Sequence, residues 1–366
     1  MNERQKAQKD FESSGQNIIV GNASECPIDP LILAKTDANS SYVRKSIDSG
    51  LTAKIYQIEI NGIHYTLKIK RKQALVSNLD GEFSFMNEVQ RRLDFYRLKA
   101  SKETSSKFKN IVETIYADYR LGIILSPWID GEAVNSLNSD IFRQILTTTN
   151  ECEKQGLMEW DLCEGNVLID GNGKVYLFDF GYMYKFNPLT DFNSNGKTDP
   201  LFHLVERFET RFFFGWLIKQ TSMTFEEQFE LYRELKLVAS EVFEDKVKWL
   251  SDANADQNVV SQFEQLLRKW KAALSNDALL LDMFTLESFR SHVLDVEDDL
   301  HGQSCTPNTI KRIDVIIESI SAHYAFLQTN GGLFYGNKDK NQKDLIDTYR
   351  SKRALAKTYL INKSTD

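Results

Sequence analysis

The sequence predicts an α+β fold of two lobes, in which a small antiparallel sheet comes first and a mainly helical part follows. Two segments of alternating apolar residues, "AKIYQIEI" (53–60) and "IHYTLKIK" (63–70), are joined by Asn61-Gly62, a strong β-hairpin signal. From about residue 202 onward, nearly every segment instead repeats its apolar residues with the period of a helix.

The small lobe is expected at residues 46–127, after a polar N-terminal extension at residues 1–45. The extension is rich in Gly, Asn, Asp and Pro, and we expect one short helix in it, near "PLILAKTDA". A helix is predicted in "GEFSFMNEVQRRLDFYRLKA" (81–100), and further strands in "NIVETIYAD" and "RLGIILSPWI". The helical spacing rests on Phe85, Val89, Leu93 and Tyr96.

The second lobe is expected at residues 128–220, with added helices at 221–366. A helix in "SDIFRQILTTTNECEKQG" precedes the strand pair "GNVLID" and "KVYLFDF", which is joined by the turn "DGNG". Beyond it, helices are predicted at 225–243, 259–274, 309–327 and 343–361.

Composition narrows the functional classes. A net charge of −7 argues against non-specific nucleic-acid binding, because the chain lacks the cationic excess that neutralises phosphates. No apolar run reaches the roughly 18 residues of a membrane span, and the polar N-terminus does not resemble a signal peptide. The four cysteines are dispersed, without the spacing of a metal site or a disulfide framework. We therefore expect a cytoplasmic protein.

The segment with the clearest chemistry is "DLCEGNVL" (161–168), followed by "DFG" (179–181). Ordinary turn chemistry explains either motif alone, but their order around a hairpin is informative. Together they resemble the catalytic and metal loops of the protein-kinase-like superfamily, closest to its aminoglycoside/choline phosphotransferase-type and atypical bacterial kinase branch. The resemblance implies that Asp161 accepts the substrate hydroxyl proton. It also implies that Asn166 and Asp179 hold Mg²⁺ (or Mn²⁺) on the phosphates of ATP.

The same resemblance implies a lysine on the third strand of the small lobe and a glutamate on the helix that follows. Lys68 and Lys70 lie on one face of the predicted strand, and we favour Lys68, with Glu88 as its partner. The alternative is that both lysines are exposed strand residues and that Glu88 is a solvated helix residue.

Two further segments carry the expected ATP contacts. "ILSPWIDGE" resembles the hinge between kinase lobes, where the Pro127 carbonyl and the Ile129 N–H would bind adenine, since proline has no N–H. "DSGLTAKIY" stands in place of the glycine-rich loop, and there we expect phosphate contacts from Ser49, Gly50 and Thr52.

The sequence therefore predicts an ATP-dependent phosphotransferase that moves the γ-phosphate of Mg-ATP to a hydroxyl of a small molecule or a protein. Glu159 and Cys163 depart from the family pattern, as Cys163 replaces a basic residue. With the glycine-poor loop, they favour one alternative, a pseudokinase scaffold without turnover. A second alternative, nucleotidyl transfer on the same fold, is not tested by any feature of the sequence. Downstream of the metal loop, a set of four polar residues either lines a substrate cleft or pairs on a helix surface: His203, Glu206, Arg207 and Arg211.

Overall fold

A computed structural model describes residues 1–47 and 50–361 of the chain. The described chain divides into two compact units, which we treat one at a time. The sheet unit comprises residues 1–135 and 165–184, and the helical unit comprises residues 136–164 and 185–361. The predicted α+β class is confirmed, and the order of sheet and helices is consistent with a bilobal kinase-like fold.

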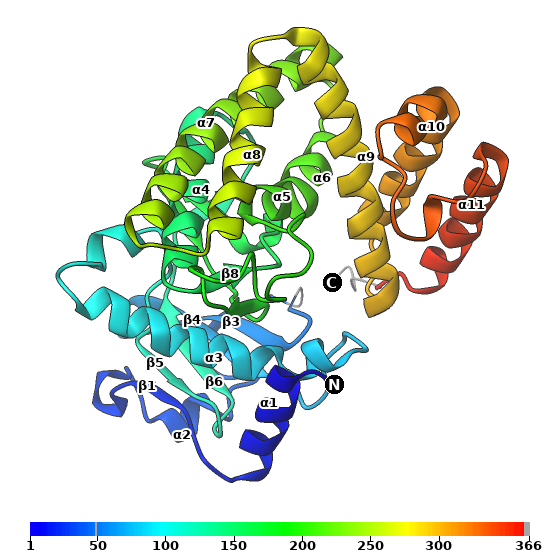
Figure 1. The fold of residues 1–366 in the computed structure, drawn as a ribbon. Helices are drawn as coiled ribbons and strands as arrows, with labels where there is room; N and C mark the ends of the chain where they lie inside the picture. The colour runs from blue at the N-terminus through cyan, green and yellow to red at the C-terminus, as the bar shows by residue number, and fades with distance from the viewer. Residues whose placement is uncertain (48–49, 362–366) are drawn as a thin grey trace. The chain divides into compact units, whose positions relative to one another are not determined.

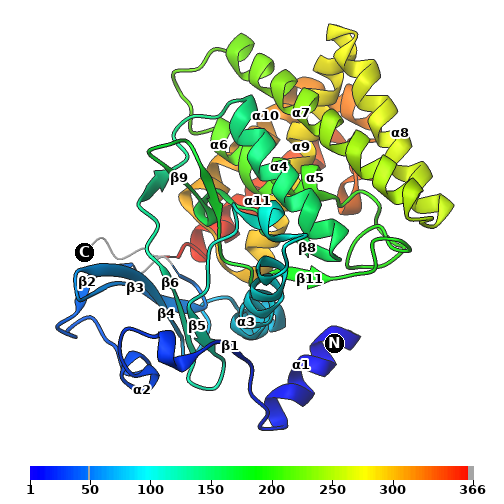
Figure 2. The ribbon, with the colours of Figure 1, turned by 90° about the vertical axis from the view of Figure 1, so that its left-hand side faces the viewer.

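The sheet unit contains an antiparallel sheet of six strands within the described residues, in the order β1-β5-β6-β4-β3-β2 (Figure 2). The strands β3 and β4 form the predicted hairpin, where Asn61 and Gly62 have φ of 53° and 77°, the left-handed conformation of a tight two-residue turn. The strands of this sheet are β1 (Ile19–Gly21), β2 (Val43–Ile47), β3 (Ala53–Ile60), β4 (Ile63–Lys70), β5 (Tyr116–Asp118) and β6 (Ile123–Pro127).

The two faces of the sheet bury different apolar sets. The long helix α3 (Leu79–Ala100) lies against one face (Figure 1), where Phe85 and Val89 share a buried cluster with Ile124. On the other face Leu33 of α2 (Pro30–Leu33) joins a cluster with strand residues. The predicted helix is confirmed, but its four spaced apolar residues do not all face the core: Tyr96 is 42% exposed, and its neighbour Phe95 is buried.

The N-terminal 45 residues contribute more than the expected short helix. β1 pairs with β5 at one edge of the sheet, and α1 (Glu3–Ser13) lies against α3, where Arg4 forms an ion pair with Asp80. The backbone at Gly21 approaches its neighbour so closely that a Cβ would collide with the Ile115 carbonyl. This part of the chain therefore belongs to the sheet unit.

A second, smaller sheet carries the hairpin between the two motifs. The strand order is β10-β9-β7, all antiparallel, and β9 pairs with β10 as predicted from "GNVLID" and "KVYLFDF". Asp170 closes the turn by accepting the N–H groups of Asn172 and Lys174. The strands are β7 (Gly131–Ala133), β9 (Val167–Asp170) and β10 (Val175–Leu177), and β11 (Met183–Lys185) follows.

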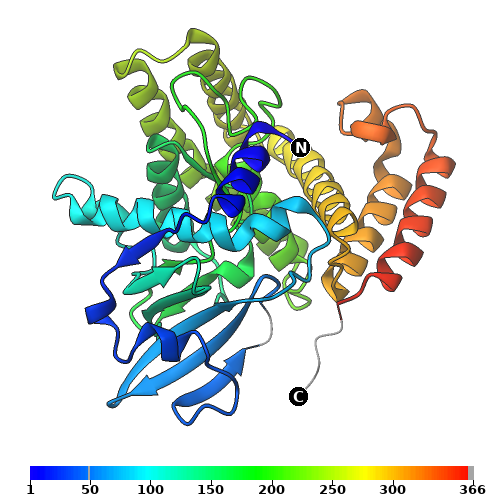
Figure 3. The same cartoon turned by 90° about the horizontal axis from the view of Figure 1, so that it is seen from below.

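The helical unit is built mainly from long amphipathic helices. Buried aromatic residues such as Phe208, Phe213 and Tyr232 fill its interior. Helix α10 lies beside α9 and α11 (Figure 3), and the three helices share a separate apolar cluster. Within the described residues no helix is both long and apolar enough to cross a membrane. Its elements are α4 (Ser139–Lys154), β8 (Leu157–Glu159), α5 (Leu204–Phe208), a π-helical turn (Glu209–Phe213), α6 (Phe214–Leu217), α7 (Phe225–Asp252), α8 (Gln257–Leu274), α9 (Asp277–Gly302), α10 (Pro307–Thr329) and α11 (Gln342–Thr358).

A buried histidine on α9 should make the helical unit sensitive to acid. His292 is 1% exposed, and burial together with repulsion from Arg312 holds its pKa well below the ordinary value. Because the unfolded chain then binds this proton first, the contribution of His292 to stability is present above about pH 6.5 and is lost as the pH falls.

We expect His292→Asn to flatten this pH dependence, since asparagine still offers Arg312 an acceptor but does not titrate. Below about pH 6.5 the free energy of unfolding of the wild type should fall more steeply, by up to about 1.4 kcal/mol per pH unit. Urea unfolding between about pH 5 and 7.5 measures both slopes. Equal slopes would contradict the assignment.

Candidate functional site

Lys68 lies on the central strand β4, on the side where α3 packs, and only 5% of it is exposed. Its ammonium donates to both carboxylate oxygens of Glu88, at 2.9 and 3.0 Å, and to Oδ2 of Asp179 at 3.0 Å. One cation thus joins the sheet, the long helix and the loop that carries the "DFG" motif.

Glu88 is held on α3 by more than this contact. It is 2% exposed and also accepts from Arg92, one helical turn later, at 2.9 Å. A buried carboxylate needs paired, hydrogen-bonded cations to offset its desolvation, and here Lys68 and Arg92 supply two. Sequence reasoning missed Arg92; its position four residues after Glu88 was the available signal.

The loop that carries Asp179 is fixed against α3. Asp179 itself adopts a left-handed conformation, with φ of 65°, which is uncommon outside glycine and concentrates at functional sites. Asn87 holds the following backbone by donating to the carbonyls of Phe180, Gly181 and Met183. A Cβ at Gly181 would collide with the Ser84 hydroxyl, so the third residue of the motif must be small. Sequence reasoning did not find Asn87.

The pair of Lys68 and Asp179 is electrostatically self-consistent. Burial lowers the pKa of Lys68, but attraction to Asp179 and Glu88 outweighs it and leaves the pKa above the ordinary value. Burial raises the pKa of Asp179, but attraction to Lys68 outweighs it and leaves the pKa below the ordinary value. Both groups are therefore charged at neutral pH.

Asn166 belongs to the same unit as Asp179, and its carbonyl accepts the N–H of Phe178 at 3.2 Å. This bond ties the two predicted metal-binding segments together through the backbone. Among the described residues no group of three or more His, Cys, Asp and Glu side chains could hold an ion alone. One carboxylate and one amide oxygen nevertheless fit Mg²⁺, a hard ion that commonly takes its other ligands from phosphate and water.

The predicted phosphate loop is only partly described, because Ser49 lies outside the described residues. Gly50 accepts a hydrogen bond from Arg71 through its carbonyl, and a Cβ there would collide with the Ala53 carbonyl. Thr52 lies 3.5 Å from the Ser84 hydroxyl. The loop thus packs tightly between β3 and α3.

The predicted hinge begins at the end of β6. Pro127 is paired in register with Tyr65, and the Trp128 N–H donates to the His64 carbonyl. In an antiparallel ladder the neighbour of a hydrogen-bonded pair is a non-hydrogen-bonded pair, so the missing N–H of Pro127 removes no ladder bond.

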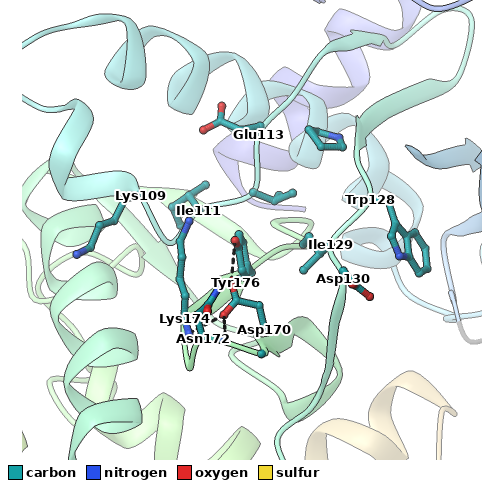
Figure 4. Close-up of a pocket in the computed structure, with 13 residues that line it drawn as sticks. Lys109, Ile111, Glu113, Trp128, Ile129, Asp130, Asp170, Asn172, Lys174 and Tyr176 are labelled. Carbon is teal, nitrogen blue, oxygen red and sulfur yellow. Dashed lines mark hydrogen bonds between the residues drawn. The ribbon is translucent and has the colours of Figure 1, made fainter. Parts of the chain in front are cut away.

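A pocket of about 570 Å³ lies beside this hinge, in the sheet unit (Figure 4). Pro127 and Ile129 line it together with the turn between β9 and β10, and Lys174 lies over the Tyr176 ring. The residues around it include neither Lys68 nor Asp179, so this pocket is separate from the ion cluster.

Asp161 belongs to the helical unit, where its loop is held at both ends. The Asp161 N–H donates to the Glu159 carboxylate at 2.7 Å, and the Asp161 carbonyl accepts from Cys163. The side chain accepts from Nε and Nη2 of Arg211, at 2.9 and 2.8 Å, both at Oδ1. Glu159, which departs from the family pattern, therefore positions the loop.

The structure thus brings Lys68, Glu88 and Asp179 into direct contact. Asn166 is linked to them through the loop backbone, whereas Asp161 is described within the other unit. Three of the four residues after the metal loop are buried, namely His203, Glu206 and Arg207. Arg207 pairs with Glu206 through two hydrogen bonds, which makes a buried pair rather than the surface pair considered from the sequence.

Comparison with known proteins gives distant matches, all to kinases. No family model matches the chain. The serine/threonine-protein kinase AtPK2/AtPK19 of Arabidopsis thaliana is 26% identical over 169 residues, which cover 42% of this chain and 33% of that kinase. Sperm motility kinases 3A and 3B of Mus musculus are each 38% identical over 48 residues, which cover 13% of this chain and 10% of each kinase.

These matches span about a third or less of the length of each relative. They are weak similarities to protein kinases, so kinase-type activity and the use of ATP with Mg²⁺ are proposals for this chain.

Proposed function

We propose that this chain is an ATP-dependent phosphotransferase that moves the γ-phosphoryl group of Mg-ATP to a hydroxyl acceptor. The observation that carries the proposal is the buried ammonium of Lys68, which bridges Glu88 on the helix and Asp179 of the "DFG" loop. A structural ion pair needs two partners. A second carboxylate on the same lysine, Asp179, which is 33% exposed, is better explained by a role toward a ligand.

Each residue then has one task. Lys68, oriented by Glu88, holds ATP phosphates with its positive charge, and Asp161 aims the acceptor hydroxyl and accepts its proton. Asn166 and Asp179 hold the Mg²⁺ or Mn²⁺ ion. When bound, the ion neutralises charge on the phosphates.

The remaining contacts follow the same assignment. We assign adenine to the Pro127 carbonyl and the Ile129 N–H, and phosphate contacts to the loop at Gly50 and Thr52. The run "DLCEGNVL" favours the aminoglycoside/choline phosphotransferase-type branch, in which added helices build the acceptor pocket. The acceptor is then a small molecule; a protein acceptor is the other outcome that the experiment below separates.

A second candidate is a pseudokinase, which binds nucleotide without turnover. The observation in its favour is that Arg211 contacts the Asp161 carboxylate, the group that should accept the proton. Turnover by the wild type distinguishes the two candidates.

The proposal predicts that ATP stabilises the protein only in the presence of Mg²⁺ or Mn²⁺. At ATP concentrations a hundredfold above Kd, the added free energy of unfolding should be about 2.7 kcal/mol. Chelation should abolish it, and so should Asp179→Asn, which removes a carboxylate ligand. Thermal unfolding with and without ATP, metal and chelator measures this effect.

Asp80→Asn is the matched control, because Asp80 is a carboxylate of the same unit that pairs with Arg4. Equal stabilisation with and without metal would contradict the assignment of Asn166 and Asp179. Intact-mass analysis of a metabolite panel and a cell lysate after incubation with Mg-ATP then identifies the acceptor. It also separates addition of a phosphoryl group from addition of a nucleotidyl group.

A further inference from the structure

The guanidinium of Arg211 stands between Asp161 and two carboxylates of α9. Nε and Nη2 donate to Oδ1 of Asp161, while Nη1 pairs with Asp295 and lies 4.0 Å from Asp299. All of these residues belong to the helical unit. Burial lowers the pKa of Arg211, but attraction to Asp295 and Asp161 outweighs it, so the group stays charged.

The backbone that carries Arg211 has an unusual conformation. Arg211 lies in the π-helical turn Glu209–Phe213, inserted between α5 and α6. π-helical turns are rare and frequently occur at functional sites, because the wider turn redirects side chains. Glu209 anchors the start of this turn through buried ion pairs with Lys236 and Arg290.

The other side of the arginine is fixed by α9 and α10. Arg312, 1% exposed, pairs with Asp295 at 2.7 Å and also donates to the carbonyl of Thr210, the residue before Arg211. This approach requires Gly215, where a Cβ would collide with the Arg312 guanidinium. Asp295 thus receives Arg211 on one oxygen and Arg312 on the other.

Arg211 also provides a positive charge that the sequence lacks at position 163. The resemblance to kinase-like loops implies a basic residue two positions after Asp161, but this chain has Cys163 there. Arg211 supplies a permanent positive charge at that loop from a different element. Because two nitrogens of the Arg211 guanidinium donate to one oxygen of Asp161, the arginine restricts the orientation of the carboxylate in addition to balancing its charge.

We infer that Arg211 is a positioning residue for Asp161: held by Asp295 of α9, it fixes the Asp161 carboxylate in the direction needed to accept the acceptor proton. This inference rests on the proposed phosphotransferase function. Arg211 acts through Asp161, so its removal should affect the rate of transfer and not the affinity for ATP.

The test is a double-mutant cycle on ATP turnover at saturating Mg-ATP. Arg211→Met should lower kcat by about 10²-fold, the size of effect expected from misplacing a reacting group, with KM for ATP nearly unchanged. Arg211→Lys should recover part of this loss, since lysine keeps the charge but not the two-nitrogen contact. In the Asp161→Asn background, Arg211→Met should cause little further loss.

Arg207→Met is the matched control, because Arg207 lies on the same segment and pairs with Glu206 instead. Any fold-loss of kcat caused by Arg207→Met should be independent of Asp161→Asn, so that the double variant shows the product of the two losses. A multiplicative loss for Arg211→Met as well would overturn the inference and leave the proposed function standing. A wild type that binds Mg-ATP but turns none over would overturn the proposed function and this inference with it.

Asp295→Asn provides a second variant if Arg211→Met does not fold. It weakens the hold of α9 on Arg211 but retains the arginine. We expect a smaller loss of kcat that again disappears in the Asp161→Asn background. An undiminished rate in folded Asp295→Asn, together with full activity of Arg211→Lys, would contradict the positioning role.

Discussion

Replacing Asp161 with asparagine should lower phosphoryl transfer by about 10²–10⁴-fold, the loss typical of removing a general base. Asparagine keeps the shape of the side chain but cannot accept a proton as the carboxylate does. Affinity for Mg-ATP should change little, because this interaction is realised mainly in the transition state. The Asp161 N–H still reaches Glu159, so the loop should keep its conformation.

The measurement pairs ATP affinity with the rate of transfer for each variant. Glu164→Gln is the control, since Glu164 is a carboxylate of the same loop that pairs with Lys219 at the surface. It should leave the rate within a few-fold of the wild type. Undiminished transfer in Asp161→Asn would remove the catalytic assignment, while a parallel loss in Glu164→Gln would indicate a disturbed loop.

The elements that sequence predicted well are those encoded by short-range patterns. The β3–β4 hairpin follows from alternation and from Asn61-Gly62, two residues that tolerate positive φ. The contact between Lys68 and Glu88 was expected because a resemblance supplied the register. Periodicity alone did not distinguish Lys68 from Lys70, because residues two apart in a strand point to the same face.

The elements that sequence reasoning missed depend on contacts between distant segments. β1 is three residues long, too short for alternation to be visible, and its pairing with β5 appears only in the folded chain. Phe95 is buried in place of Tyr96 because the second half of α3 packs it against Phe108 and Phe180. Helical spacing predicts which residues share a face of the helix, but the segments packed against the helix decide which of them are buried.

The contacts of two site residues, Asn87 and Arg211, show the same limit. Asn87 reads as an ordinary polar helix residue, yet it holds three carbonyls of the "DFG" loop. Arg211 lies 50 residues after Asp161 in a segment of aromatic residues, and its contact depends on the π-helical turn. A motif search detects residues that act on the ligand, whereas these two act on other residues.

Lys68→Met should remove both activity and stability, and Lys70→Met should remove much less of either. Loss of Lys68 leaves Glu88 with Arg92 alone and Asp179 without its lysine. Breaking a buried ion pair by removing one partner costs about 3–5 kcal/mol. Lys70 instead contacts the ring and the hydroxyl of Tyr119, a contact of about 1 kcal/mol.

The pH at which this comparison is made follows from the direction of the shift. The pKa of Lys68 is raised by folding, so its contribution to stability is fully present below about pH 10.4 and is lost only as the pH rises through the higher folded value. The pKa of Asp179 is lowered, so its contribution is present above about pH 3.9 and is lost in acid. Urea unfolding and Mg-ATP turnover at pH 7 therefore measure the full effect of the substitution. A larger loss of turnover in Lys70→Met would move the phosphate-binding lysine two residues along β4, whereas equal and small losses in both would mean that the buried cluster is not the ATP site.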